Sequence, residues 1–127
     1  MSKIKLIETS KAPIPLGHYS QATVHNNTIY VAGQLGIDPK NPKQMGSIEE
    51  QTEQCLNNIR EILIAAGSDL NHLLKLTLYV TDMNLWAQVN AVYARILQNH
   101  KPARAIVPVN DLHHGYLIEI DAIAALK

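Results

Sequence analysis

An arginine and a glutamate near the end of the chain are the residues whose chemistry stands out. Arg104 lies in the strand-like segment 102–107 and Glu119 in the segment 118–121, with a short loop containing Gly115 between them. A guanidinium can grip a carboxylate or phosphate with two parallel hydrogen bonds, and a nearby glutamate can hold or deprotonate a water. Two strands joined in this way can lie side by side or near each other. The pair therefore suggests a small site that binds an anionic substrate and hydrolyses it.

The same two residues have a plainer interpretation as a structural ion pair between neighbouring strands. Such pairs are common and contribute little at a surface, so the residues alone leave both interpretations open. Asp121 follows Glu119 by two positions and projects from the same face of the strand. We interpret Asp121 as a structural or rim residue, because nothing in the sequence requires a second acid.

Other chemical motifs are missing from the sequence. Its histidines show neither an i, i+4 pair nor the HExxH pattern, so we predict no metal site. They are His18, His25, His72, His100, His113 and His114. The segment 33–36 contains two glycines but fits neither a P-loop nor a dinucleotide fingerprint. Cys55 falls on an apolar helical stripe, where a buried and inert thiol is expected.

Composition narrows the class of protein. The 127 residues are 46% hydrophobic, which predicts one folded domain over residues 1–127. Eleven basic residues balance eleven acidic ones without a basic cluster, so nucleic-acid binding is not expected. The first residues are too often charged for a signal-peptide core, and no apolar run is long enough to span a membrane. We therefore expect a soluble cytoplasmic protein.

The first half of the chain predicts a short strand, a hairpin and a helix. Residues 4–8 are a possible strand, and Asn26-Asn27 is a turn signal between strands at 22–25 and 28–33. Ser47 and Glu50 form a capping box, and Gly67 supplies the stop of the helix that follows. The apolar positions of this helix recur at helical spacing. They are Cys55, Ile59, Ile62, Leu63 and Ala66.

The second half predicts a strand, a helix and two more strands. Residues 74–81 alternate between apolar and other side chains, and strands follow the helix at about 103–109 and 116–125. Asp82 or Asn84 would cap that helix, whose stripe is Leu85, Val89, Val92, Tyr93, Ile96 and Leu97. The order predicts an α+β fold in which two helices pack on one face of a mixed sheet.

The other face of this sheet is predicted to be half polar. It would carry Lys75, Thr77, Tyr79 and Thr81, with Tyr30, Ala32 and Gln34 beside them. Two helices cover only one face, so we infer that the second face meets other subunits. A solvated antiparallel face explains the pattern equally well, and this alternative stays open.

Several stretches together resemble one family. They are 17–22, 31–34, Asn58-Ile59 ahead of Ala66-Gly67, 90–93, 102–104 and 118–122. Each motif is weak alone, but their order and spacing are similar to those of the reactive intermediate/imine deaminase (Rid) family, formerly YjgF. The resemblance extends over residues 12–125. It implies a chorismate-mutase-like α+β fold and a homotrimer with active sites between subunits.

The resemblance also implies roles for individual residues. Arg104 matches the arginine that binds the substrate carboxylate in the deaminase-active branch, and Glu119 matches the water-positioning glutamate. The other matches are to residues around the substrate: Tyr19 to a pocket tyrosine contributed across the interface, Asn90 to a nearby polar residue, and Gly33 and Ile106 to backbone and wall positions. Some positions depart from the family pattern. His18 and His113 replace frequent prolines, Ala105 a frequent serine, and Ile106 a frequent cysteine.

The implied activity is hydrolysis of 2-imino acids, such as 2-iminobutanoate and 2-iminopropanoate, to 2-oxo acids and ammonia. A protonated imine is already a strong electrophile, so neither a metal nor an organic cofactor is expected. One alternative is a trimer that binds small molecules or proteins in the same cleft without turnover. A ribonuclease or translation inhibitor is a further alternative, and the balanced charge argues against it.

Overall fold

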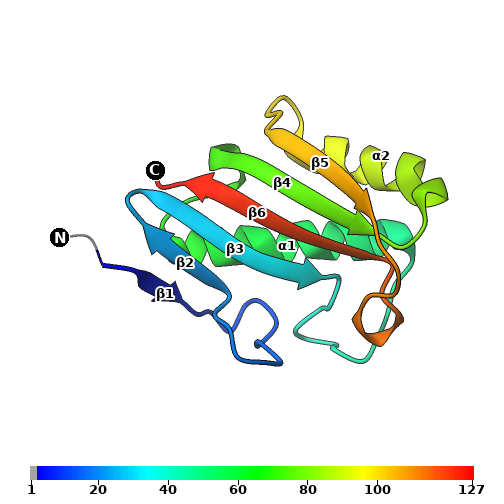
Figure 1. The fold of residues 1–127 in the computed structure, drawn as a ribbon, viewed down its shortest axis with the longest axis horizontal. Helices are drawn as coiled ribbons and strands as arrows, with labels where there is room; N and C mark the ends of the chain where they lie inside the picture. The colour runs from blue at the N-terminus through cyan, green and yellow to red at the C-terminus, as the bar shows by residue number, and fades with distance from the viewer. Residues whose placement is uncertain (1–2) are drawn as a thin grey trace.

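The computed structural model describes residues 3–127, which build one six-stranded sheet with both α-helices on one of its faces (Figure 1). The strand order is β1-β2-β3-β6-β4-β5. The strands are β1 (Lys5–Ile7), β2 (Ala22–His25), β3 (Thr28–Leu35), β4 (Leu73–Val80), β5 (Ala103–Pro108) and β6 (Ile118–Ala125). The helices are α1 (Ile48–Ala66) and α2 (Trp86–Leu97), with short 3-10 turns η1 (Leu70–His72), η2 (Met83–Leu85) and η3 (His113–Gly115). The predicted α+β fold, a mixed sheet with two helices on one face, is confirmed.

Local sequence signals place the β2–β3 hairpin. Asn26 and Asn27 take φ angles of +50° and +66°, the left-handed conformation that a two-residue type I′ turn requires. Asparagine tolerates this conformation better than most residues. The turn pairs His25 with Thr28, so it also sets the register of the hairpin, as the sequence predicted.

Helix α1 begins and ends at the predicted residues. The Ser47 hydroxyl accepts a hydrogen bond from the Glu50 backbone N–H (3.2 Å), and the Glu50 carboxylate accepts one from the Ser47 N–H (2.9 Å). Gly67 ends the helix with φ of +91°, which glycine adopts without a steric cost. The predicted apolar stripe from Cys55 to Leu63 is fully buried against the sheet.

Strand β4 departs from the predicted alternation at its start. The register to β6 shifts between Leu73 and Lys75, so Leu73 is buried and Leu74 is 49% exposed. The expectation of unbroken alternation from Leu74 onward is therefore wrong at its first position. An extra residue at a bulge reverses the faces of the residues before it.

Strand β3 contains a second irregularity with a consequence for function. The register to β6 shifts between Val31 and Gln34, which leaves Ala32 and Gly33 opposite the single residue Asp121. Gln34 is consequently buried on the helix side, where its carbonyl accepts a hydrogen bond from the Cys55 thiol (3.1 Å). The prediction that Gln34 lies on the open face is wrong, because the sequence pattern gives no sign of the bulge.

Helix α2 links β4 to β5, which run parallel. Asp82 caps the preceding turn η2 by accepting a hydrogen bond from the Asn84 N–H (2.8 Å). The buried residues of α2 belong to the predicted stripe. They are Val89, Val92, Tyr93 and Leu97. This stripe holds α2 against the sheet and α1.

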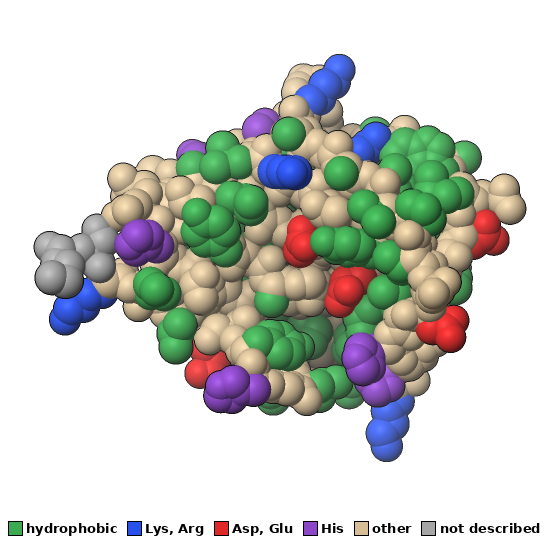
Figure 2. Space-filling model, in the orientation of Figure 1, with side chains coloured by type: hydrophobic (Ala, Val, Ile, Leu, Met, Phe, Trp, Pro, Cys, Tyr) green, Lys and Arg blue, Asp and Glu red, His purple; other side chains and the backbone are tan. Residues whose placement is uncertain are grey.

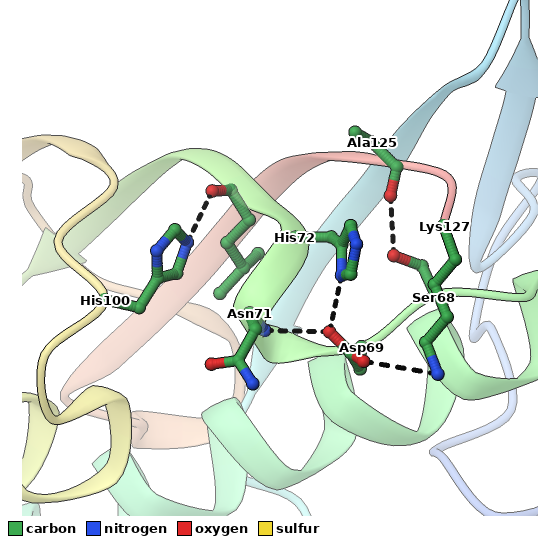
Figure 3. A network of polar contacts seen from close by, with 8 residues as sticks. Ser68, Asp69, Asn71, His72, His100, Ala125 and Lys127 are labelled. Atoms are coloured by element: carbon green, nitrogen blue, oxygen red, sulfur yellow. Dashed lines mark hydrogen bonds and ion pairs between the residues drawn. The ribbon is translucent and has the colours of Figure 1, made fainter.

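The ends of α1, β4 and β6 are tied together by polar contacts (Figure 3). The Ser68 hydroxyl donates to the Ala125 carbonyl (2.6 Å), and Asp69 contacts both the His72 ring (2.7 Å) and the Lys127 ammonium (3.3 Å). This network lies at the end of β6 opposite to Glu119. It anchors the final strand without taking part in the site described below.

The open face of the sheet is a mixed surface (Figure 2). Acidic side chains lie near its middle among hydrophobic groups, and the surface is hollowed beside them. Tyr30 is 48% exposed and Lys75 is exposed on this face, whereas Tyr79 is half-buried. Neither helix covers these groups.

Candidate active site

Glu119 stands in a cavity on the open face of the sheet. It pairs with Leu35 of β3 and Tyr79 of β4, and its side chain points away from the helices because its neighbours in β6 point toward them. The cavity has a volume of about 630 Å³. Tyr19, Gly33 and Glu119 all line it, so the structure brings these three predicted site residues together.

Gly33 makes a close contact with the Glu119 side chain. A Cβ atom at residue 33 would lie 3.0 Å from both Cδ and Oε2 of the Glu119 side chain. That distance is shorter than an ordinary carbon contact, so a side chain at residue 33 would push the carboxylate away by a few tenths of an ångström. The bulge in β3 thus places bare backbone beside the acid.

The surroundings of Glu119 change its acidity. Burial raises the pKa of Glu119 above its ordinary value, the nearby charge of Asp121 raises it further, and His113 lowers it. A carboxylate with a raised pKa is a stronger base toward water. Asp121 itself accepts a hydrogen bond from the Tyr79 hydroxyl (3.0 Å), which raises the pKa of Tyr79. This bond agrees with a structural role for Asp121.

Two buried glutamines fix the loops that wall the cavity. The Gln21 amide donates to the carbonyls of Thr9 (3.0 Å) and Pro13 (2.9 Å), so it holds the loop that leads to Tyr19. Gln51 of α1 accepts a hydrogen bond from the Leu117 N–H (2.9 Å), next to the turn that carries His113. The walls are therefore attached to the core by buried polar contacts.

Arg104 lies elsewhere, on the edge strand β5. Its register opposite Leu76 turns the side chain toward the helix side, where Nη1 donates to Oδ1 of Asn90 (2.9 Å). The guanidinium carbon also lies 4.5 Å from the centre of the Trp86 ring and 4.8 Å from that of Tyr93. Arginine is commonly stacked on aromatic rings in this way. Arg104 remains exposed at the edge of the sheet.

Arg104 and Glu119 are not neighbours within one chain. Strand β4 separates β5 from β6, and the two side chains leave opposite faces of the sheet. The alternative of an Arg104–Glu119 pair between neighbouring strands is therefore wrong, and Arg104 bonds to Asn90 instead. The expectation that both residues act in one site is not met by a single copy of the chain.

The predicted site residues divide into two groups, which we call the acid half-site and the arginine half-site. The acid half-site contains Tyr19, Gly33 and Glu119. The arginine half-site contains Asn90, Arg104 and Ile106. Ile106 lies two residues beyond Arg104 on the same face of β5 and packs partly against the core.

Neither half-site has the side chains of a metal centre. Within residues 3–127, no group of three or more His, Cys, Asp or Glu side chains could hold a metal ion. His72 is bonded to Asp69, and His100 lies 2.8 Å from the Leu73 carbonyl. No α-helix in the described part of the chain is both long and apolar enough to cross a membrane.

Sequence reasoning missed three residues of these half-sites. Trp86 and Tyr93 contact Arg104 through their rings. Trp86, Asn90 and Tyr93 stand at positions i, i+4 and i+7, which lie on one face of a helix. The sequence shows this spacing, but it does not show that Arg104 on β5 is the residue that these side chains contact. The spacing of the histidines gives His113 no role, whereas in the structure it lines the cavity with Glu119.

Comparison with known proteins gives consistent results. Residues 9–126 match the family model described as endoribonuclease L-PSP. A RutC family protein of Pyrococcus horikoshii is 48% identical over 94% of this chain and 96% of its own length. The mouse 2-iminobutanoate/2-iminopropanoate deaminase is 44% identical over 94% of this chain and 90% of its own. The crystal structure of Escherichia coli TdcF with bound serine superimposes with a TM-score of 0.92 at 31% identity, covering 97% of this chain and 98% of that one.

Proposed function

The chain belongs to the Rid (YjgF) family, and on that premise we propose that it is a hydrolytic deaminase of reactive 2-imino acids. Its substrates would be small, such as 2-iminobutanoate and 2-iminopropanoate, and its products the 2-oxo acid and ammonia. Two relatives support this assignment. The mouse relative is named for these two substrates, and TdcF was crystallised with serine, a small molecule that also carries a carboxylate.

The proposed active unit is a homotrimer with its sites between subunits. The observation that supports this assembly is the division of the site into two half-sites on opposite faces of the sheet. The carboxylate-binding group and the water-binding group can act on one small molecule only if they come from different copies. A closed ring lets each copy use its arginine half-site on one neighbour and its acid half-site on the other.

Arg104 would bind the substrate carboxylate. Its guanidinium is fixed on one side by Asn90 and keeps further N–H donors for two charge-assisted hydrogen bonds. This grip fixes the adjacent imine carbon relative to the opposing subunit, so the reacting atoms meet without a further search.

Glu119 would position a water and accept its proton. The water oxygen forms a bond to the imine carbon, and the electron pair of the C=N bond moves to nitrogen. Glu119 then returns the proton to the nitrogen of the resulting carbinolamine. As the C–N bond breaks and ammonia leaves, the hydroxyl gives its proton to Glu119 and its oxygen becomes the C=O oxygen. The raised pKa of Glu119 suits it to accept the proton and return it in the second step.

The decisive experiment measures turnover of an imine that an amino-acid oxidase generates in the assay, with semicarbazide added to trap the imine that has not been hydrolysed. Arg104→Ala should abolish acceleration. Glu119→Gln should lower the rate by about 10²-fold or more, the usual effect of losing a general base. Glu119→Gln should change calorimetric binding of 2-oxobutanoate far less, since Arg104 carries that contact, while Asp121→Asn should affect neither measurement strongly at neutral pH. Near-normal turnover by Arg104→Ala would refute the mechanism.

Measurements on the same protein samples distinguish the two alternative functions, a binding module without turnover and a ribonuclease. A trimer that binds 2-oxobutanoate but gives no turnover is the binding module. RNA binding that weakens steeply with added salt would favour the ribonuclease named by the family model. The eleven basic and eleven acidic residues offer little excess charge for phosphate, so we expect neither outcome.

A further inference from the structure

The Arg104 guanidinium lies over two aromatic rings that come from one helix. Its central carbon is 4.5 Å from the Trp86 ring centre and 4.8 Å from the Tyr93 ring centre. Seven residues separate these rings in α2, which corresponds to about 10.5 Å along the helix axis. Both distances lie within the range of a cation–π contact, so the guanidinium contacts both rings of this one helix face.

The contacts leave the edge of the guanidinium available. A stacked ring covers a planar face, from which no N–H points, and all five N–H donors lie in the plane. Asn90, which lies between the two rings in the helix, receives the one hydrogen bond that residues 3–127 make to this guanidinium. The remaining donors of Arg104 are therefore held in a fixed plane at an exposed edge of the sheet.

We propose that Trp86 and Tyr93 are positioning residues that hold Arg104 in the plane needed to bind the substrate carboxylate. The proposal rests on the proposed imine hydrolysis and specifies how its carboxylate site is built. Both rings and Asn90 belong to the same chain as Arg104, so this half-site is formed before either a substrate or a second subunit arrives. Without the rings, the long arginine side chain would sample many rotamers and lose binding free energy by becoming ordered.

The ring of Tyr93, rather than its hydroxyl, performs this role. The Tyr93 hydroxyl is buried and has no hydrogen-bond partner within the described residues 3–127. It therefore contributes no polar contact to Arg104 that a phenylalanine would lose. The ring remains 4.8 Å from the guanidinium carbon, where cation–π attraction operates.

The test is steady-state imine hydrolysis by variants of both rings. Trp86→Leu and Tyr93→Leu should each raise KM by about tenfold with little change in kcat, because carboxylate binding is shared by the substrate and the transition state. Trp86→Phe and Tyr93→Phe keep a ring and should restore most of the affinity. Gln88→Ala, on the exposed opposite side of α2, is the matched control and should leave both constants unchanged.

Binding of 2-oxobutanoate gives a second readout. Trp86 is the single tryptophan of the sequence, so its fluorescence reports directly on the arginine half-site. Titration should change the emission of the wild-type protein, and Arg104→Ala should remove that change. In the Arg104→Ala background, the residual binding that calorimetry measures should be weakened no further by Tyr93→Leu, because Tyr93 acts through the arginine.

The proposal is overturned if the leucine variants fold and keep the wild-type KM, or if Tyr93→Leu and Arg104→Ala weaken binding additively. It is also overturned if Tyr93→Phe is as impaired as Tyr93→Leu, since the hydroxyl would then be the active group. Should the leucine variants unfold, the phenylalanine variants and the fluorescence titration still decide it. A wild-type protein without turnover would instead refute the proposed function.

Discussion

Two inactive variants of this chain, Arg104→Ala and Glu119→Gln, should regain activity when they are dissociated and reassembled together. The reason is that Arg104 and Glu119 leave opposite faces of the sheet, with β4 between their strands. In the proposed site between subunits, Arg104 comes from one copy and Glu119 from the next. In a mixed assembly, some interfaces must then pair an intact arginine with an intact glutamate.

The size of the recovery follows from the geometry. In an equal mixture, half of the arginine half-sites and half of the acid half-sites are intact, and in a closed ring they are drawn from different copies. About a quarter of the sites therefore contain both residues, which predicts about a quarter of the wild-type rate. In a trimer, every assembly that contains both variants has one such site, whichever variant is in excess.

Imine hydrolysis measured after reassembly checks this prediction, with differently tagged subunits to show by mass that mixed assemblies form. Arg104→Ala mixed with the double variant Arg104→Ala/Glu119→Gln is the control. It contains no intact arginine and should stay inactive. Absence of recovery in mixed assemblies of the two single variants would show that Arg104 and Glu119 do not act across an interface, and would refute the reasoning from the sheet faces.

Three further predictions concern single residues. Arg104→Lys should lower kcat/KM by about 10²-fold, because an ammonium cannot reproduce a stacked, two-pronged contact. Since lysine keeps the positive charge, steady-state kinetics of this variant will show whether charge alone suffices. The rate of hydrolysis should fall at low pH as Glu119 becomes protonated. Because His113 lowers the pKa of Glu119, His113→Asn should move this acid limb of the pH–rate profile to higher pH. An acid limb that stays in place or moves to lower pH would contradict the assignment of Glu119 as the general base. Gly33→Ala should reduce kcat by at least about tenfold, because its Cβ would push the Glu119 carboxylate out of place. Gly17→Ala is the control and should be tolerated, because its Cβ would meet Tyr19 at an ordinary 3.6 Å. Equal kinetics for the two variants would argue against the close contact.

The parts of the fold that the sequence predicts well are those determined by local chemistry. Ser47 and Glu50 need only each other and the backbone to start α1, and Gly67 needs only its own φ angle to end it. Asn26 and Asn27 likewise form the hairpin turn by their own conformations. In each case the physical cause lies within a few residues of its effect.

The parts that the sequence does not predict depend on residues far apart in the chain. The exposure of Leu74 and the burial of Gln34 follow from bulges relative to β6, a strand that comes more than forty residues after Leu74 and eighty after Gln34. The separation of Arg104 from Glu119 follows from the strand order, which places β4 between their strands. The residues of the candidate site could thus be named from the resemblance, but their division between two faces could not.

The position of β6 in the sheet has a consequence for how the chain is made. It is the last strand in the sequence, yet it lies between β3 and β4 and carries Glu119. During synthesis, five strands leave the ribosome before the one that joins them, and until then β3 and β4 each have an unpaired edge. Folding of the sheet is therefore expected to be late and dominated by distant contacts. Nascent chains stalled before residue 118 should be digested rapidly by protease, and early protection would contradict this order.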